Sequence, residues 1–166
     1  MPGRRQELRN KTIYPSDPHT RIKHRIYRGY LDCWMPKILQ AGWHQGAVVI
    51  DAFSGSGSYT DGLEGSPVLV ARTFLEHQAR SRFKPLRLVT LEERKDRTEA
   101  LRARLAEMPP CPELTLSVQD PGEFSIKRQS LASTFLSHRE PALWLIPDPP
   151  LKYLSVVSAL LIRSSP

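Results

Sequence analysis

The residues best suited to chemistry in this chain are carboxylates and glycines that follow short apolar segments. Each apolar run that is predicted to be a strand ends near a carboxylate, and these carboxylates are Asp51, Glu92, Asp120 and Asp148. A Cβ at Gly55 or Gly57, in the turn after the first run, would occupy the space that a closely approaching ligand needs. An acidic residue at the end of the next strand can accept hydrogen bonds from both hydroxyls of a ribose. The pattern therefore predicts a site for a nucleoside-containing cofactor.

The spacing of the glycines separates the candidate cofactors. The turn contains Gly55 and Gly57 but lacks the third glycine of the dinucleotide pattern, and Glu92 follows Gly57 by 35 residues, farther than is usual for NAD. The sequence has no Gly-x-Ser-x-Gly elbow and no glycine loop ending in Gly-Lys-Ser/Thr, which argues against hydrolase and NTPase sites. An NAD-binding or nucleotide-sugar-binding domain stays open as a weaker alternative.

The elements that must position these residues alternate between helices and strands. Asp17-Pro18 has the form of an N-cap followed by proline at the first helical position. The helix that follows is predicted to end near Gly42 and to bury one stripe of residues, Ile22, Ile26, Tyr30, Cys33 or Trp34, and Ile38. Residues 47–50 are apolar and mostly β-branched, which is typical of a strand buried on both faces of a parallel sheet.

Later segments continue this alternation. Helices are predicted over residues 68–79, 94–107 and 130–137, strands over residues 86–91, 114–118 and 142–146, and the start of a last helix over residues 154–162. This order predicts an α/β domain with a parallel sheet of about four strands and helices on both faces. Ligands bind such sheets outside the carboxyl ends of the strands, at the point where the strand order reverses.

One block of the sequence resembles a known family. Residues 51–59, Asp-Ala-Phe-Ser-Gly-Ser-Gly-Ser-Tyr, followed by Asp61-Gly62 and Gly65-Ser66-Pro67, are similar to the motif region of the three-Cys-motif partner family. The resemblance implies a three-layer Rossmann-like fold of the class I methyltransferase type. It also implies S-adenosylmethionine as the cofactor.

Weaker likenesses extend the resemblance over about residues 19–160. The first predicted helix, with Lys23, Tyr30-Leu31 and Trp34, is similar to the opening segment of the family, and Leu91-Glu92 and Asp148-Pro149 are similar to its strand ends. The methyltransferase sheet continues beyond a fourth strand, whereas little sequence follows Asp148. The fold is therefore expected to be incomplete, with the fourth strand as an exposed apolar edge, as in a truncated product, a fragment or one half of a complex.

The resemblance also implies roles for individual residues. Asp51, Gly55 and Gly57 would shape the pocket for the methionine part of S-adenosylmethionine, with Phe53 and Tyr59 as neighbours. Glu92 would accept hydrogen bonds from the ribose hydroxyls.

Two more residues have a second interpretation each. Asp120 would hold the amino group of the adenine, or Asp120-Pro121-Gly122 forms a plain turn. Lys23 would reach the carboxylate of the cofactor, or it is an exposed charge on a helix.

Asp148, Pro149 and Pro150 form the predicted catalytic segment. In amino-group methyltransferases, an Asp-Pro-Pro-aromatic tetrapeptide after the fourth strand holds the target nitrogen through a side-chain acceptor and a backbone carbonyl. Leu151 stands where the aromatic residue would stack on a flipped base, and the resembled family usually has Asp-Pro-Phe-Gly here. The alternative is that the two prolines only end a strand.

Composition limits the setting of the protein and its partners. The 166 residues fit one domain, residues 17–166, after a flexible basic tail, residues 1–16. The net charge of +7 is compatible with a nucleic acid as partner, or it reflects solvated helix faces. The two distant cysteines and five scattered histidines predict neither a disulfide nor a metal site, and the histidines are expected at the surface. A reducing cytoplasm fits best, and no apolar run is long enough to span a membrane.

Two functions follow from these observations. The first is an S-adenosylmethionine-binding, methyltransferase-like protein that modifies an amino group of a nucleic acid. The alternative is a catalytically inactive partner of a three-Cys-motif protein, which keeps the fold and acts by protein–protein docking. Only the first function includes methyl transfer, so an assay of methyl transfer distinguishes the two functions.

Overall fold

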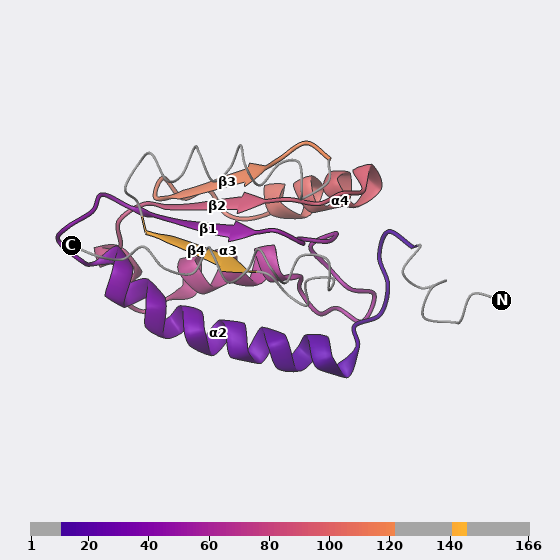
Figure 1. Cartoon of the computed structure of the whole chain (residues 1–166), viewed down its shortest axis with the longest axis horizontal. Coiled ribbons are helices and arrows are strands. Elements are labelled where there is room, and N and C mark those ends of the chain that lie inside the picture. Colours follow the sequence, from indigo (N-terminus) through magenta and orange to yellow (C-terminus); the bar gives the residue numbers. More distant parts are fainter. Residues whose placement is uncertain (1–10, 122–140, 146–166) are drawn as a thin grey trace, which may run out of the picture.

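The core of the protein is a parallel β-sheet flanked by helices (Figure 1). The computed structural model describes residues 11–121 and 141–145. Its strands are β1 (Ala47–Asp51), β2 (Leu86–Thr90), β3 (Leu114–Val118) and β4 (Ala142–Leu145), and they lie in the order β3-β2-β1-β4. All three pairings are parallel. The α/β, Rossmann-like fold predicted from the sequence is therefore confirmed.

The strand order places β1 at the centre of the fold. Strands β2 and β3 add to one side of β1, and β4 adds to the other side, so the strand order reverses between β1 and β4. In the register, Asp51 at the end of β1 is level with Thr90 of β2 and Leu145 of β4. Every residue of β1 is buried, as expected for a strand covered on both faces.

The helices of the described residues lie against one face of the sheet. They are α2 (Pro18–Leu39), α3 (Ser66–Glu76), the short 3-10 helix η1 (Arg80–Arg82) and α4 (Lys95–Ala106). Residues of α2 and α3 share an apolar cluster with Val49 and Leu88, and α4 packs on β3. The opposite face of the sheet carries Val48 and Ile50, which are also buried. The helices predicted over residues 130–137 and 154–162 lie outside the described residues.

Helix α2 begins as predicted but buries a different stripe. Oδ1 of Asp17 accepts a hydrogen bond from the backbone N–H of Thr20 at 2.7 Å, and Pro18 is the first helical residue. The buried residues of α2 are His24, Leu31, Met35 and Leu39. The predicted stripe is wrong in its first half, since Ile22, Ile26 and Tyr30 are 56%, 62% and 51% exposed. Trp34 and Ile38 do pack against the core, whereas Cys33 is exposed.

This difference has a geometric reason. A turn of about 100° per residue places the exposed and the buried residues on opposite sides of the same helix. Both sets have helical spacing, so the spacing alone does not say which set faces the sheet.

Residues 11–16 lie against the rest of the domain, which differs from the flexible tail expected for them. The backbone N–H of Thr60 donates to the carbonyl oxygen of Tyr14 at 3.1 Å, and Oγ of Ser16 donates to Oδ2 of Asp61 at 2.5 Å. Nη2 of Arg97 donates to the carbonyl oxygen of Lys11 at 3.0 Å. These contacts fix the segment beside the turn after β1 and the start of α4. Residues 1–10 lie outside the described residues.

Strand β4 is the end strand of the described sheet, next to β1. Its Trp144 is half-buried and packs against Ala52 and the apolar cluster on the face of Val48 and Ile50. The predicted fourth strand is thus present at the expected place. Within the described residues, no helix is long and apolar enough to cross a membrane.

Candidate functional site

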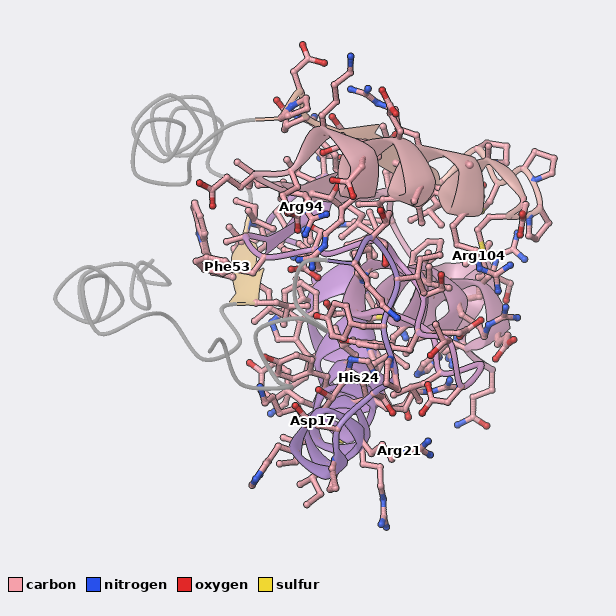
Figure 2. All side chains as sticks on the ribbon, turned by 90° about the vertical axis from the view of Figure 1, so that its right-hand side faces the viewer. Asp17, Arg21, His24, Phe53, Arg94 and Arg104 are labelled. Carbon is pink, nitrogen blue, oxygen red and sulfur yellow. The ribbon has the colours of Figure 1, made fainter. Side chains whose placement is uncertain are left out.

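The carboxyl ends of the strands bring together residues from several segments (Figure 2). In parallel sheets of this kind, ligands bind at this edge, at the reversal of strand order. Here the reversal lies between β1 and β4, beside Asp51. Figure 2 views this edge, with Phe53 beside β4, Arg94 at the start of α4 and His24 on α2. The turn after β1 lies between them.

Ser54 holds the turn after β1 against the end of β2. Its side chain is buried, and Oγ donates to the carbonyl oxygen of Asp51 at 2.8 Å and accepts from the N–H of Leu91 at 3.1 Å. The N–H of Ser54 donates to the carbonyl oxygen of Leu91 at 3.0 Å. These bonds fix the path of the backbone before the two glycines.

The two glycines of the turn have different roles. Both have positive φ values, +62° at Gly55 and +78° at Gly57, which favour glycine. A Cβ on Gly57 would lie 2.8 Å from Cδ1 of Leu101, so α4 fills the space beside Gly57. This differs from the prediction that Gly57 leaves room for a ligand. A Cβ on Gly55 would meet no atom within 4 Å. Gly55 is thus the glycine with open space beside it.

Gly65 completes the packing of this turn. A Cβ on Gly65 would lie 2.8 Å from Cα of Gly57, and the N–H of Gly65 donates to the carbonyl oxygen of Gly57 at 2.8 Å. The glycine of the Gly-Ser-Pro block is therefore required by a close contact between two backbones. Helix α3 begins at the next residue, Ser66.

Asp51 is a fully buried carboxylate with one oxygen that lacks a hydrogen bond. Its Oδ1 accepts from the N–H of Phe53 at 3.2 Å, and its Oδ2 has no hydrogen-bond partner among the described residues. Burial raises the pKa of Asp51 to about 6, and the negative charge of Glu92 adds to the rise. The Ser66 hydroxyl and the N–H of Phe53 act in the opposite direction and lower the pKa. At pH 7 the group is mainly ionised. An ionised, buried oxygen of this kind requires a donor or a cation.

Glu92 connects the turn after β1 to the start of α4. Its Oε2 accepts from the N–H of Gly55 at 2.9 Å, and its Oε1 accepts from the N–H of Arg94 at 3.0 Å. The carboxylate therefore contacts the backbone of Gly55, while the Cβ side of Gly55 stays open. A carboxylate oxygen has capacity for a further hydrogen bond, so Glu92 can still accept bonds from hydroxyl groups.

Tyr59 lies between the turn and the beginning of α2. Its ring is edge-on to the ring of Tyr14, with centroids 5.6 Å apart, and 6.0 Å from the ring of His24. Burial raises the pKa of Tyr59 to about 12, with smaller contributions that include Tyr14 and Asp51. Tyr59 is therefore a neutral phenol close to the Asp51 carboxylate.

Lys23 and His24 are neighbours on α2; Lys23 is partly exposed and His24 is buried. Burial lowers the pKa of His24, and the positive charge of Lys23 lowers it further. His24 and His44 are both buried, so the prediction that all five histidines lie at the surface is wrong for these two. The helix spacing places His24 on the face of α2 that packs inward.

Phe53 and Asp120 lie at opposite ends of this edge. Phe53 is half-buried and packs with Ala52 and Trp144, on the β4 side. Asp120 follows β3, with β2 between that strand and β1, and its side chain is 88% exposed and bonded to Nη2 of Arg102 at 2.8 Å. The structure thus brings Asp51, Phe53, Gly55, Tyr59 and Glu92 together and leaves Asp120 at the margin. Asp148, Pro149 and Pro150 lie outside the described residues.

Ser54, Ser66 and His24 were not predicted as members of this site. Ser54 lies close to Asp51 in the chain, and Ser66 lies in the Gly-Ser-Pro block, so each could have been predicted as a site residue from its position. Serine is also common in plain turns, however, and the positions alone do not separate the two roles. No described group of three or more His, Cys, Asp or Glu side chains has the geometry to hold a metal ion.

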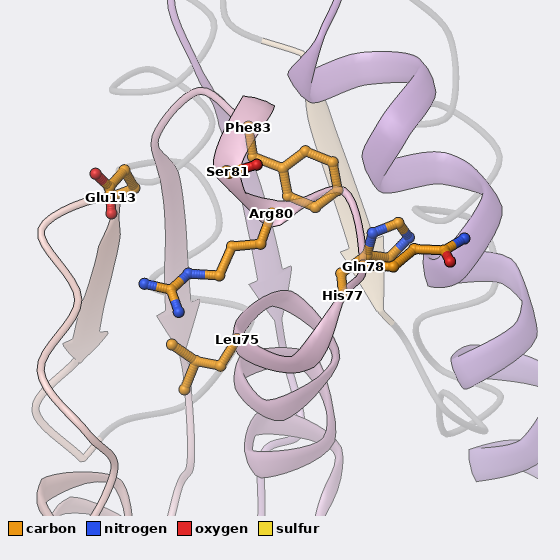
Figure 3. Close-up of a pocket in the computed structure, with 7 residues that line it drawn as sticks. All are labelled: Leu75, His77, Gln78, Arg80, Ser81, Phe83 and Glu113. Carbon is orange, nitrogen blue, oxygen red and sulfur yellow. The ribbon is translucent and has the colours of Figure 1, made fainter.

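A separate hollow opens at the amino edge of the sheet (Figure 3). It has a volume of about 380 Å³, and its lining includes Leu75, His77, Arg80, Phe83 and Glu113. Nδ1 of His77 accepts from the N–H of Ala79 at 3.0 Å, and its Nε2 lies 3.2 Å from the carbonyl oxygen of Asp32. Both ring nitrogens of His77 are thereby engaged in holding local structure. The predicted site residues do not line this hollow.

The geometry at the carboxyl edge therefore suits a ligand that carries a positive charge and hydroxyl groups. Asp51 offers a buried negative oxygen, Gly55 offers open space, and Glu92 offers acceptors beside it. Neither a scan against protein-family models nor a search of the curated proteins finds a match to this chain.

Proposed function

We propose that this protein binds S-adenosylmethionine at the carboxyl edge of its sheet. The observation that carries the proposal is Oδ2 of Asp51, which is buried and has no hydrogen-bond partner among the described residues. Leaving such an oxygen unsatisfied costs about 1–3 kcal/mol or more, so a ligand that supplies a donor gains that much. The ammonium group of the methionine part is a charged donor that fits this oxygen.

The residues around Asp51 fit the remaining parts of the same ligand. Gly55 leaves the space in which the methionine part would lie, and Glu92 would accept hydrogen bonds from the ribose hydroxyls. Phe53 and Tyr59 would form the walls next to the turn. Lys23 would attract the carboxylate of the cofactor, and Asp120 would have to exchange its contact with Arg102 for the adenine amino group.

The proposed reaction is methyl transfer to an amino group of a nucleic acid. When bound, S-adenosylmethionine supplies an activated methyl group. Asp148, Pro149 and Pro150 would hold the target nitrogen with its lone pair toward the cofactor. The net charge of +7 supports a polyanionic substrate, and two free cysteines, Cys33 and Cys111, support a place in the reducing cytoplasm.

A second candidate is a docking protein that keeps the cofactor fold without methyl transfer. The observation that favours it is Leu151, which replaces the aromatic residue after Asp148-Pro149-Pro150. Leu151 itself has no ring on which a flipped base could stack. In this case, the partner would be a three-Cys-motif protein.

Calorimetric titration of the full chain tests cofactor binding. We expect S-adenosylmethionine to bind and NAD to bind much more weakly. Asp51→Asn keeps the shape of the side chain but removes its charge, and should weaken binding at least about tenfold, the effect of losing a charged hydrogen bond. Glu92→Gln should weaken it less. Glu93→Gln alters an exposed neighbouring carboxylate and serves as the matched control, with unchanged binding.

The proposal fails if a folded chain does not bind S-adenosylmethionine, or if Asp51→Asn and Glu93→Gln bind it equally well. Transfer of a radiolabelled methyl group to RNA or DNA separates the two candidates. Transfer that Asp148→Ala abolishes would support the enzyme, whereas binding without transfer would support the docking protein.

A further inference from the structure

Helix α2 carries an exposed apolar stripe on the face directed away from the sheet. Ile22, Ile26 and Tyr30 follow one another at intervals of four residues, and each is more than half exposed. Cys33 continues this row and is also exposed. Scattered exposed apolar residues are normal, but three in a row along one helix are typical of a surface that contacts another protein. We define these three residues as the α2 stripe.

Gly29 lies within the same face of α2. A Cβ at this position would meet no atom within 4 Å, and its helical φ value does not require glycine. Glycine inside a helix destabilises it relative to alanine. The described parts of the chain thus give no structural reason for glycine here. A backbone that approaches α2 closely from outside would give such a reason.

The charges of α2 are mostly positive, with five Lys or Arg residues against one acidic residue, Asp32. Arg25 lies beside the stripe and Lys37 lies about two turns beyond Tyr30; both are exposed and form no ion pair within the described residues. The nearest acidic residue of the helix, Asp32, is turned toward Arg28 at 3.7 Å. A second copy of this chain would bring the same positive charges against each other, which disfavours self-association through this face. A partner with carboxylates beside apolar residues is complementary.

From these observations, we propose that the α2 stripe docks an acidic amphipathic helix of another protein. Its apolar residues would pack against Ile22, Ile26 and Tyr30, and its carboxylates would pair with Arg25 and Lys37. A nucleic acid would use the two cations but not the isoleucines, so the apolar residues favour a protein partner. This surface is separate from the Asp51 site, and the inference does not depend on the proposed function.

A pair of labelled helical peptides tests the surface by fluorescence anisotropy with the full chain. The first peptide has leucines at helical spacing flanked by glutamates, and the second has lysines in place of the glutamates. We expect only the acidic peptide to bind. The double substitution Ile22→Ser with Ile26→Ser should weaken its binding at least about tenfold, because two partly exposed isoleucines lose their contact.

Matched variants distinguish specific docking from nonspecific hydrophobic binding. Trp43→Gln removes an apolar residue that is 65% exposed outside the helix, and should bind the peptide like the parent chain. The double substitution Arg25→Glu with Lys37→Glu should reverse the preference, so that the basic peptide binds and the acidic peptide does not. Arg82→Glu on η1 should leave the preference unchanged. Circular dichroism melting verifies the fold, and the midpoints should be unchanged because all these residues are exposed.

Several results would overturn the proposal. These are a folded chain that binds neither peptide or binds both equally, and a Trp43→Gln variant that loses binding as much as the stripe variant does. Sedimentation showing a dimer that Ile26→Ser dissociates would assign the surface to self-association. Stronger binding of duplex DNA or of anionic phospholipid vesicles, lost on the stripe substitutions, would assign it to those ligands.

Discussion

Asp51 is in a position where burial opposes the ionisation of its carboxyl. Burial of its carboxyl raises its pKa to about 6, above the ordinary 3.8, so the folded chain holds a proton there more tightly than the unfolded chain does. The stabilisation from this group is therefore complete below about pH 4 and is lost as the pH rises through about 6. At neutral pH, the buried charge destabilises the fold. Under the proposed function, this is the cost of keeping a charged group ready for a ligand.

The pH dependence of stability should change in Asp51→Asn. Between about pH 4 and pH 7, the free energy of unfolding of the variant should rise relative to the parent chain by up to about 3 kcal/mol, because only the parent must ionise a buried carboxyl. Urea unfolding at several pH values measures this difference, and comparison with the parent removes the effect of all other groups. A difference that does not vary with pH would show that Asp51 is not held as described.

Substitution of the two glycines should show that their surroundings differ. Gly57→Ala should destabilise the fold by more than about 2 kcal/mol, because it combines a positive φ value with a Cβ that is 2.8 Å from Leu101. Gly55→Ala should cost about 1 kcal/mol, since only the φ value is unfavourable. Denaturant unfolding checks both values. Equal losses for the two variants would contradict the different surroundings assigned to these glycines.

At the residue scale, the sequence predicted which carboxylates and glycines lie at the carboxyl edge, but not the structural role of each glycine. Asp51, Gly55 and Glu92 do lie together, as strand ends in a parallel sheet require. Gly57 is needed for close packing against Leu101, a residue of α4 that is distant in sequence. Such a contact has no local signal.

At the scale of elements, α2 is the clearest case of an ambiguous pattern. It has apolar residues on two opposite faces, one facing α3 and the sheet and the other exposed. The N-cap Asp17 and the first residue Pro18 were predictable because capping depends on neighbours in sequence. The choice of the buried face was not, because it depends on the shape of the surface that the helix meets.

Truncation of one residue on each face of α2 tests this orientation. Leu31→Ala should destabilise the fold by about 2–5 kcal/mol, because Leu31 is fully buried. Ile26→Ala should change the stability by about 0.5 kcal/mol or less, because its side chain is 62% exposed. Thermal or denaturant unfolding compares them. A larger loss for Ile26→Ala would show that the helix faces the sheet with its other side.

At the scale of the whole molecule, the strand order explains why the turn after β1 and Glu92 meet. Helices α3 and α4 carry the chain from β1 to β2 and β3 on one side, and β4 takes the other side of β1. The turn after β1 therefore meets the end of β2, where Glu92 contacts it, and residues 11–16 and α2 close around Tyr59. The alternation of helices and strands predicted the parallel sheet. The placement of residues 11–16 was not predictable, because it depends on contacts with Thr60, Asp61 and Arg97.

Proton release on cofactor binding tests the central claim most directly. Calorimetric titration with S-adenosylmethionine at pH 6, in two buffers of different ionisation enthalpy, measures the protons exchanged. An ammonium group beside Asp51 would lower the pKa of its carboxyl, so about half a proton should leave the parent chain per ligand, and none should leave Asp51→Asn. Binding without proton release, release that Asp51→Asn retains, or no binding by the folded chain would contradict the site proposed at the carboxyl edge.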